Sequence, residues 1–503
     1  MTDVDDLGRL RGRRVLVAGA GVSGRAVTGP LADLGAEVTV TDSRPESLAR
    51  SAADGVATIP VEHLLADRGE IAEFALVVTS PGFRPDAPLL AAAAGAGVPI
   101  WGDIELTWRI DRAEIYGPAR RWLVVTGTNG KTTTTSMLEA ILVAAGIPAA
   151  ACGNIGLPVI DALRTTPRVE VLAVELSSFQ LFWAPSVRPD AGAVLNIAED
   201  HLDWHGGMQG YIDAKARALT GRVAVVGLDD PEAARLGRAS AAEVTVGFRL
   251  GEPEHGEFGI VAGALVDRAF ADVEVLAPAA GITPPGEAGL LDALAAAALA
   301  RAAGVAPEAV ADGLAGHRVG PHRGAVVEEV DEVRYVDDSK ATNPHAARSS
   351  LLAHSRIVWV AGGLLKGARV EELVIEIAPR LAGAVLIGED AGVIAEALAR
   401  HAPEVPVVRV ETGDDAGVTP GEQTQVDRVV LPGSTPADAV MAVAVDRASR
   451  LAEAGTAVVL APAAASLDMF DSYGHRGRSF AAAVAGLPGR SRGRAQTDPP
   501  GTP

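Results

Sequence analysis

A loop near residue 127 carries the residue types that hold a polyphosphate. An apolar segment, 123–125, runs into a Gly-rich stretch, and an apolar-periodic run typical of a helix follows it. Backbone N–H groups of such a loop and of the helix N-terminus bind phosphate oxygens, while a lysine and a hydroxyl suit the charge and the Mg²⁺ of ATP. The candidate ATP-binding residues here are Gly127, Thr128, Asn129, Gly130, Lys131, Thr132 and Thr133.

The loop departs from the general phosphate-loop pattern at one position. The pattern G-x-x-x-x-G-K-[ST] requires glycine at position 125, where this chain has Val125. The loop therefore either binds no phosphate or belongs to a class with a shorter rule. The order of strand, glycines, lysine, threonine and helix favours the second interpretation, with Lys131 on the β- and γ-phosphates and Thr132 on Mg²⁺.

Polar side chains follow two further apolar segments of the same region. Glu175 comes directly after "VLAV", and Asp200 and His201 come shortly after "AGAVL". The carboxyl ends of strands in an open parallel sheet face the ligand crevice, although a strand-end glutamate can also be a solvated charge. Oxygen ligands favour Mg²⁺, whereas Zn²⁺ prefers closer His and Cys spacing. Glu175 and His201 are therefore candidate metal ligands.

Lysine is rare in this chain. Of 44 basic residues only four are lysines, Lys131, Lys215, Lys340 and Lys366. Arginine keeps its proton and its fork shape, so a retained lysine indicates a place that needs a compact, titratable ammonium. The alternative is that four surface lysines are a chance remnant.

A second Gly-rich turn lies near the N-terminus. The apolar segment "RVLVA" is followed by Gly19, Gly21 and Gly24, and the next strand-like segment, "AEVTVTD", ends on Asp42. This is a G-x-G-x-x-G turn with an acid after the next strand, the dinucleotide-binding fingerprint. By itself the pattern fits either a ribose or pyrophosphate site or a tight strand-to-helix turn.

The chain alternates apolar strands with helical patterns, which predicts an α/β fold with mostly parallel sheets. Its 503 residues suit about three domains. We predict a Rossmann-like N-terminal domain over 1–112, a central P-loop ATPase-like domain over 113–318 and a Rossmann-like C-terminal domain over 319–487. The tail, 488–503, has no apolar periodicity and is predicted to be disordered.

Composition narrows the class of protein. A hydrophobic fraction of 48% and a charged fraction of 21% fit a soluble globular chain. The net charge of −20, without a basic block, argues against nucleic acid and anionic membranes as partners. The start of the chain lacks an export signal, and the Ala-rich runs are too short for membrane insertion. A single cysteine, Cys152, agrees with a reducing cytosol. We expect a cytoplasmic monomer.

Six motifs, taken in order, carry a resemblance to a known family. They are "TGTNGKTT", "GNIGLP", "ELSSFQL", "NIAEDHLDWHG", "DDSKATNP" and "APAAASLDMF". Because it carries all six motifs, the chain resembles the Mur ligases of peptidoglycan synthesis over about residues 1–487. Several of the motifs are shared across the superfamily, including folylpolyglutamate synthases. The stretch "DDSKATN" and the Gly-rich N-terminal unit favour the member of the family that adds D-glutamate.

The resemblance implies what a bound ATP is used for. A carboxylate does not condense with an amine in water until one of its oxygens becomes a leaving group. Ligases of this family phosphorylate the carboxylate of their UDP-linked substrate, here UDP-N-acetylmuramoyl-L-alanine, and the amine of D-glutamate then attacks the acyl phosphate. Two anions must approach each other in the first step, so cations must offset their repulsion.

The resemblance also implies a two-metal site. Thr132 and Glu175 match ligands of one Mg²⁺, and His201 matches a ligand of a second. Lys215 falls where the family carries a lysine carbamylated by CO₂, which makes it an anionic oxygen ligand; arginine stays protonated and is excluded. The alternative for Lys215 is a helix-surface lysine paired with Asp213 or Glu199. The implied catalytic set is Lys131, Glu175, His201 and Lys215.

Substrate contacts follow from the same motif matches. ATP contacts beyond the loop are implied for Asp292, Arg323, Asp338 and Lys340. The UDP precursor is implied to bind Val22, Ser23, Gly24, Asp42, Ser43, Arg44, Ser80, Pro81, Gly82 and Asn154. D-glutamate is implied to bind Thr342, Lys366, Ser466 and Tyr473, because an ammonium and hydroxyls suit a dianion. Contacts to ATP from two domains imply closure that excludes water.

The chain departs from the family at the adenine site. The family commonly shows G-x-H-N-x-x-N, whereas residues 286–292 read "GEAGLLD". Only Asp292 is left as a polar side chain at the matched asparagine and histidine positions. Shape and backbone contacts are the alternative means of holding the base.

Three rival functions stay open at this level. A ligase of the same superfamily could add L-alanine, a diamino acid or a dipeptide. A dinucleotide-dependent oxidoreductase would use the N-terminal turn but leaves the loop at 127–132, Glu175 and Lys215 without a role. A non-catalytic nucleotide switch would bind ATP without forming an amide.

Overall fold

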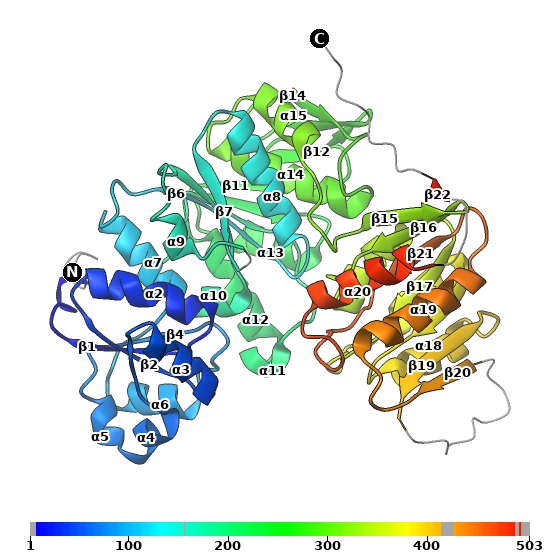
Figure 1. The fold of residues 1–503 in the computed structure, drawn as a ribbon. Helices are drawn as coiled ribbons and strands as arrows, with labels where there is room; N and C mark the ends of the chain where they lie inside the picture. Colours follow the sequence, from blue (N-terminus) through cyan, green and yellow to red (C-terminus); the bar gives the residue numbers. More distant parts are fainter. Residues whose placement is uncertain (1–6, 155, 414–425, 488–491, 494–503) are drawn as a thin grey trace, which may run out of the picture. The chain divides into compact units, whose positions relative to one another are not determined.

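The computed structural model describes residues 7–154, 156–413, 426–487 and 492–493. Three mostly parallel sheets with flanking helices confirm the predicted α/β class (Figure 1). The chain forms two compact units, one of 1–282 with 289–317 and one of 283–288 with 318–503. The predicted domain boundaries at 112/113 and 318/319 stay predictions. The tail predicted to be disordered lies outside the described residues except for Arg492–Gly493, which form β22.

The first sheet has the order β3-β2-β1-β4-β5, and all its pairs are parallel. Its strands are β1 (Arg14–Ala18), β2 (Glu37–Thr41), β3 (Ala57–Thr58), β4 (Leu76–Thr79) and β5 (Ile100–Gly102). Its helices are α2 (Val22–Asp33), α3 (Pro45–Ala53), α4 (Val61–Ala66), α5 (Arg68–Ile71), α6 (Pro88–Gly95) and α7 (Asp103–Arg112). The central strands β1 and β4 read as continuous apolar runs because helices cover both faces.

The N-terminal Gly-rich turn joins β1 to α2 under steric constraint. Gly19 has a φ of +99°, which favours glycine. A Cβ at Gly24 would lie only 1.8 Å from the Gly19 carbonyl oxygen. The helix therefore approaches the turn so closely that a side chain at Gly24 is excluded.

The second sheet belongs to the same compact unit and has the order β14-β13-β12-β11-β10-β9-β6-β8-β7. Its strands are β6 (Arg121–Thr126), β7 (Ala149–Gly153), β8 (Val171–Glu175), β9 (Ala191–Val194), β10 (Val223–Gly227), β11 (Val244–Phe248), β12 (Glu257–Val261), β13 (Ala264–Asp267) and β14 (Glu274–Pro278). Pairs from β7 to β12 are parallel, and β12, β13 and β14 form an antiparallel end.

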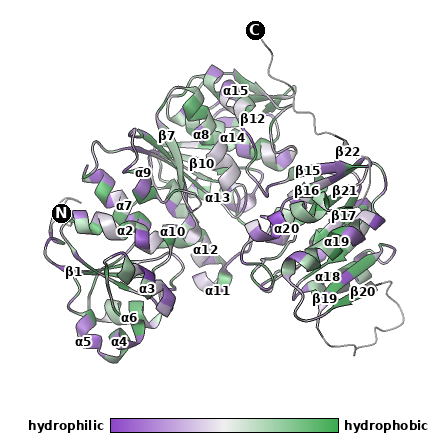
Figure 2. Ribbon diagram, viewed as in Figure 1, coloured by the Kyte–Doolittle hydropathy of each residue, from purple (hydrophilic) through white to green (hydrophobic). Residues whose placement is uncertain are grey.

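Helices of the second sheet cover two apolar clusters. They are α8 (Lys131–Ala144), α9 (Val159–Ala162), α10 (Ser178–Phe182), α11 (Leu202–His205), α12 (Met208–Ala216), η1 (Arg217–Leu219), α13 (Pro231–Ala239), α14 (Glu287–Ala302) and α15 (Pro307–Gly316). The Ala-rich α14 is buried along most of its length, because small side chains let it pack closely against the sheet. The strands are largely hydrophobic and the outer helix faces more hydrophilic (Figure 2).

The second unit holds the third sheet, with the order β20-β19-β18-β17-β21-β16-β15-β22. Its strands are β15 (Ala325–Val330), β16 (Val333–Asp337), β17 (Ile357–Ala361), β18 (Leu381–Leu386), β19 (Val407–Thr412), β20 (Val426–Leu431), β21 (Ala457–Leu460) and β22. Its helices are α16 (Pro344–Leu352), α17 (Glu371–Ile377), η2 (Ala378–Arg380), α18 (Ala391–His401), α19 (Ala437–Leu451) and α20 (Tyr473–Ala485). The pairs from β20 through to β16 are parallel, and β15 pairs antiparallel with both β16 and β22.

A buried arginine ties the strand ends of the third sheet together. Arg476, on α20, is 1% exposed. Its guanidinium donates to the Ser339 hydroxyl at 3.0 Å, the Ser339 carbonyl at 2.9 Å and the Ala464 carbonyl at 3.1 Å. Burial lowers the pKa of Arg476 to about 10, and Asp468 and Asp337 oppose that shift. These bonds hold the segments after β16 and β21 beside each other.

Two glycines of α2 test the steric constraint at the turn. Gly24→Ala forces a clash with the Gly19 carbonyl, so we expect the free energy of unfolding to fall by about 1–3 kcal/mol. Gly29→Ala is the control, because the nearest atom to its new Cβ is 3.6 Å away. Alanine there favours the helix by up to about 1 kcal/mol. Thermal melts followed by circular dichroism measure both, and equal melting temperatures would contradict the constraint.

Candidate active site

The strand order brings the predicted phosphate and metal residues to one edge of the second sheet. Strand β6 lies between β8 and β9, and all three run parallel. The phosphate loop follows β6, Glu175 is the last residue of β8, and Asn196 comes soon after β9. These positions meet because the carboxyl ends of parallel neighbours lie at the same edge.

Asn196 fixes the phosphate loop and was missed in the sequence analysis. Its carbonyl accepts from the Thr128 N–H at 3.0 Å, and its side-chain oxygen accepts from the Asn129 N–H at 2.9 Å. Its amide also donates to the Asn129 carbonyl at 3.2 Å. Gly130 then begins α8 with a φ of +82°. The only sequence signal for Asn196 is its place as a polar residue just past a strand.

Two lysines share one carbonyl of the loop. Lys131 Nζ donates to the Gly127 carbonyl at 2.9 Å and to the Thr128 carbonyl at 2.7 Å. Lys215 Nζ donates to the same Gly127 carbonyl at 2.7 Å. Both predicted residues therefore lie at the loop, and their like charges oppose each other when both are protonated.

Lys215 is buried rather than exposed on a helix surface. It is 1% exposed and lies on the inner face of α12, with its Nζ 4.7 Å from the centroid of the Tyr211 ring. Burial, followed by the charge of Lys131, lowers the pKa of Lys215 well below its usual value, against the opposing carboxylates of Asp200 and Glu175. The alternative of a surface lysine paired with Asp213 or Glu199 is therefore wrong.

Tyr211 is a second residue that the sequence analysis missed. It lies one helical turn before Lys215 on α12, so both side chains face the loop. Its hydroxyl is 2.9 Å from the Thr128 hydroxyl, which also accepts from the Ala198 N–H at 2.9 Å. Burial raises the pKa of Tyr211, so its hydroxyl stays protonated. Tyr211 thus holds the loop from the side of α12.

Glu175 presents a buried carboxylate to this edge. It is 1% exposed, and its two oxygens accept from the Thr132 hydroxyl at 2.8 Å and from the Asn154 amide at 3.0 Å. Within the described ranges it has no ion-pair partner. Burying a carboxylate is costly, and a cation beside it offsets that cost. A carboxylate with a neighbouring hydroxyl is the oxygen donor set that suits Mg²⁺, so these residues fit the metal.

Few protein side chains other than Glu175 and Thr132 are placed to bind a metal ion at this edge, among the residues that the structure describes. Over residues that the structure describes, no group of three His, Cys, Asp or Glu side chains is close enough to hold a metal ion. Mg²⁺ commonly uses one or two carboxylates and takes its other ligands from phosphates and water. The arrangement therefore agrees with a metal that binds together with a nucleotide.

His201 lies on the segment after β9 in a left-handed backbone conformation, with a φ of +52°. Its Nε2 is 3.5 Å from an Asp200 carboxylate oxygen, and its ring centroid is 4.7 Å from that of Phe179. Its side chain is 36% exposed, which leaves it accessible to a ligand. Its role at a second Mg²⁺ stays a prediction.

Asp292 lies against the start of α8. It is 7% exposed and accepts from the Thr134 hydroxyl at 3.1 Å. A Cβ at Gly130 would come within 2.2 Å of its Oδ1. Asp292 therefore lies against the phosphate loop and supports it, and its predicted contact with adenine stays a prediction.

The predicted UDP residues other than Asn154, which follows β7 of the second sheet, gather at the carboxyl edge of the first sheet. Asp42 accepts from the Ala20 N–H at 2.8 Å and the Arg44 N–H at 2.9 Å. Burial alone would raise the pKa of Asp42, but these bonds and the Arg44 guanidinium lower it below its usual value. Asp42 thus holds the Gly-rich turn, and Arg44 is fixed beside it. Their contacts with the nucleotide stay predictions.

The residues of the two remaining predicted UDP-binding stretches also lie at this edge. Val22 begins α2 and is 65% exposed, and the Ser23 hydroxyl opposes the effect of burial on the pKa of the neighbouring Asp103. Burial raises the pKa of Asp103 to about 6. The loop 80–82 follows β4, next to the turn after β1, because these strands are paired in parallel. The Ser80 hydroxyl lies 3.5 Å from the Gly19 carbonyl.

The predicted residues of the second unit follow three adjacent strands, β17, β21 and β16. Lys340 Nζ lies 4.1 Å from the centroid of the Tyr473 ring, and Ser466 is buried. Lys366 is exposed, with a φ of +53°. Burial, with some help from the neighbouring Asp337, raises the pKa of Asp338 to about 7. Their edge position suits ligand binding, and the roles of these residues and of Arg323 and Thr342 stay predictions.

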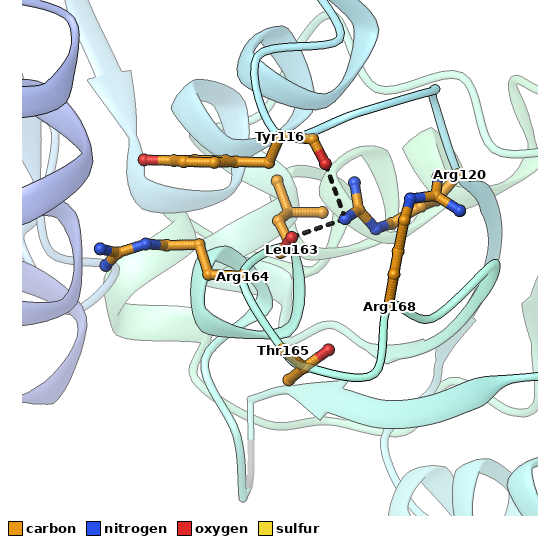
Figure 3. Close-up of a pocket in the computed structure, with 6 residues that line it drawn as sticks. All are labelled: Tyr116, Arg120, Leu163, Arg164, Thr165 and Arg168. Carbon is orange, nitrogen blue, oxygen red and sulfur yellow. Dashed lines mark hydrogen bonds between the residues drawn. The ribbon is translucent and has the colours of Figure 1, made fainter.

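A cavity of about 320 Å³ lies in the first compact unit, away from the phosphate loop at the carboxyl edge of the second sheet (Figure 3). Its lining residues come from 116–120 and 163–168, which precede β6 and β8. The cavity is therefore at the amino ends of these strands. The Arg120 guanidinium points to the Tyr116 and Leu163 carbonyls, and Arg164 extends in another direction, toward Asp33. Since its arginines do not converge, we assign the cavity no ligand.

Comparison with known proteins defines the class. Residues 125–262 match the Mur ligase middle domain, and residues 13–102 match the N-terminal domain described as Mur ligase MurD-like. The chain belongs to the Mur ligase family, ATP-dependent ligases of peptidoglycan precursor synthesis, for which ATP and Mg²⁺ are implied.

Close relatives carry one name. A Rhodococcus jostii protein is 73% identical, over 95% of this chain and 96% of the relative. A Mycolicibacterium smegmatis protein is 59% identical, over 94% of this chain and 96% of the relative. Both are named UDP-N-acetylmuramoylalanine--D-glutamate ligase.

Solved structures agree on the fold. MurF from Acinetobacter baumannii has a TM-score of 0.55 at 16% identity, covering 96% of this chain and 93% of that chain. UDP-N-acetylmuramate-alanine ligase MurC from Thermotoga maritima has a TM-score of 0.54 at 17% identity, covering 94% and 99%. At these identities the likeness supports the three-sheet architecture alone.

Among the described helices none has the length and apolar character needed to cross a bilayer.

Gly130 and Gly146, which flank α8 on its two sides, test the role of the loop. Both have left-handed backbones, with φ values of +82° and +71°. A Cβ at Gly130 would meet Asp292, whereas nothing lies within 4 Å of one at Gly146. We expect Gly130→Ala to weaken ATP binding about fivefold or more, since relieving such overpacking costs about 1–3 kcal/mol. Gly146→Ala should leave ATP affinity unchanged. Isothermal titration calorimetry measures both, and equal affinities would contradict the assignment.

Proposed function

We propose that this chain joins D-glutamate to UDP-N-acetylmuramoyl-L-alanine at the expense of ATP. The observation that carries the proposal is the 73% identity, over nearly the whole of both chains, to a protein named for that reaction. The two lysines on the phosphate loop and the buried Glu175 support it, because this chemistry needs cations around a transferred phosphoryl group. ATP and UDP-linked precursors are cytosolic, and we propose a cytoplasmic monomer.

The first step is phosphoryl transfer. A carboxylate oxygen of the substrate attacks the γ-phosphorus, and the bond to the bridging oxygen of ADP breaks. Lys131 exchanges its two carbonyl partners for the β- and γ-phosphates, and the N–H groups of the loop hold phosphate oxygens. Asn154, which donates to Glu175, is proposed to orient the substrate carboxylate.

The second step forms the amide. The amine of D-glutamate attacks the acyl carbon, inorganic phosphate leaves, and the nitrogen loses a proton. Thr342, Lys366, Ser466 and Tyr473 are proposed to hold the two carboxylates of D-glutamate. Lys340, Arg323 and Asp338 are proposed to contact ATP from the same unit, with Asp338 on the ribose. Asp292 is the proposed polar contact for adenine.

Two Mg²⁺ ions are proposed at the edge of the second sheet. Thr132 and Glu175 would hold one, and His201 with a carbamate on Lys215 would hold the other. When bound, the ions offset charge on the phosphate and carboxylate oxygens. The Thr132 hydroxyl would then turn from donating to Glu175 to offering its oxygen lone pairs.

The surroundings of Lys215 support carbamate formation. A neutral amine attacks the carbon of CO₂, a C–N bond forms, one C=O electron pair moves to oxygen, and a proton leaves. Burial and the adjacent Lys131 lower the pKa of Lys215, which favours the neutral amine. The product is an anion beside Lys131, so it replaces a repulsion with an attraction.

Phosphate release from ATP tests the reaction. With UDP-N-acetylmuramoyl-L-alanine and Mg²⁺, we expect release that depends on D-glutamate and a product heavier by one glutamyl residue. L-alanine, a diamino acid and D-alanyl-D-alanine are the competing acceptors. Turnover with one of those alone would keep the ligase chemistry and overturn the assigned amino-acid pocket. ATP binding without turnover would favour a nucleotide switch, and NAD(P)H binding by absorbance would favour an oxidoreductase.

A matched pair of cations locates the D-glutamate pocket in that assay. Lys366→Met should raise the KM for D-glutamate about tenfold or more, because it removes a charged donor to a carboxylate. Arg369→Met is the control, since Arg369 is a neighbouring cation whose side chain is 83% exposed. An equal effect of both variants would indicate a general charge effect.

Carbon NMR in ¹³C-bicarbonate buffer tests the carbamate without relying on turnover. We expect one carbamate signal in the unaltered protein and in Lys366→Met, and none in Lys215→Arg. Activity of Lys215→Arg should fall at least about 100-fold, because arginine stays protonated and cannot bind the metal. A signal that persists in Lys215→Arg would place the carbamate elsewhere, and a fully active variant would remove its role.

A further inference from the structure

Two tryptophans bridge the first and second sheets within one compact unit. Trp204 Nε1 donates to the Gly82 carbonyl at 3.2 Å, and Trp183 Nε1 donates to the Phe83 carbonyl at 3.1 Å. Trp183 follows α10, and Trp204 is in α11. We call Trp183 and Trp204 the indole clamp. The indole clamp holds the loop 80–83, which follows β4, through hydrogen bonds to the main-chain carbonyls of that loop.

Further contacts reinforce the clamp. The Arg84 guanidinium donates to the Asp203 carbonyl at 2.8 Å, in the opposite direction to the indoles. The Trp183 carbonyl accepts from the Gly102 N–H at 3.0 Å, at the end of β5. A Cβ at Gly102 would lie 2.6 Å from the Trp183 Cβ, so the two backbones are closely packed. The first sheet thus meets the clamp at two of its strand ends.

On its other side the clamp packs into an aromatic cluster that reaches the candidate active site. The ring centroids of Phe182 lie 5.0 Å from Trp183 and 5.2 Å from Trp204. Phe179 lies 4.8 Å from Trp204 and 4.7 Å from His201. Both phenylalanines are on α10, which starts three residues after Glu175. The clamp is therefore continuous with the elements that carry Glu175 and His201.

The two indole N–H groups of the clamp donate to the protein's own main chain. Indole has a single donor and no acceptor, and both indole N–H groups are used on main-chain carbonyls. Neither tryptophan is therefore free to hydrogen-bond a base or a phosphate through its ring nitrogen. Their contribution is to position the loop.

We propose that the indole clamp is a positioning device that fixes the spacing between the nucleotide end and the reacting carboxylate end of the UDP-linked substrate. The inference rests on the proposed function, in which the loop 80–82 and the Gly-rich turn hold the UDP group while Asn154 and Glu175 lie at the other end. A ligand that spans both ends needs the clamp. UDP alone, which reaches only the first sheet, does not.

Binding measurements on Trp204→Phe test this distinction. The variant keeps an aromatic ring in the cluster and removes the donor to Gly82. We expect affinity for UDP-N-acetylmuramoyl-L-alanine to fall about fivefold, the size expected for losing one neutral hydrogen bond. Affinities for UDP and for ATP should not change. Arg84→Met, which removes the opposing bond, should shift the same affinity in the same direction.

Trp101→Phe is the matched control, because Trp101 is in the first sheet and stacks on Arg109 rather than on the loop. It should leave all three affinities unchanged, and melting temperatures show that each variant is folded. Equal losses for UDP and for the full substrate would overturn the proposal, since they would mean that the clamp only orders the loop. No loss for either would also overturn it. Because binding is measured apart from turnover, failure of the proposed D-glutamate reaction would be seen separately, in the unaltered protein.

Discussion

The candidate active site depends on a pair of hydrogen bonds to one oxygen. Lys131 and Lys215 both donate to the Gly127 carbonyl. Two ammonium groups on one oxygen repel each other, and burial penalises the charge of Lys215 further. The conflict is relieved when Lys215 is neutral or anionic, or when Lys131 leaves for a phosphate. The loop is thus arranged around a charge that the substrates supply.

Glu175 supplies the negative charge that balances the two lysines at this edge of the second sheet. Its carboxylate is buried at the end of β8 and is held by a hydroxyl and an amide instead of a cation. A buried negative charge next to a pair of lysines forms a site in which added Mg²⁺ and phosphate complement each other's charges. Asn196 and Tyr211 hydrogen-bond the loop itself, and Asp292 hydrogen-bonds Thr134 in the first turns of the helix that follows it. Preorganisation of this kind keeps the donors in place before substrates bind.

Much of the fold and part of the site could be predicted from local patterns. The strand at 14–18 and the helix after the phosphate loop coincide with β1 and α8, because apolar runs bounded by glycine are strong local signals. Asn196 and Tyr211 were missed because their partners lie 67 and 83 residues away in the chain. The burial of Lys215 could not be settled either, since a helical lysine faces solvent or protein according to what packs on the helix.

The α/β class, the phosphate loop, the residue types at the strand ends and the family could all be predicted from the sequence, because local order and motif spacing encode them. Only the folded chain shows which strand ends are neighbours, that two lysines converge on the Gly127 carbonyl, and that Trp183 and Trp204 join the first sheet to the second. The reason is physical: strand order and side-chain burial arise from packing between distant segments. A pattern within one segment carries no record of the partner that the fold brings to it.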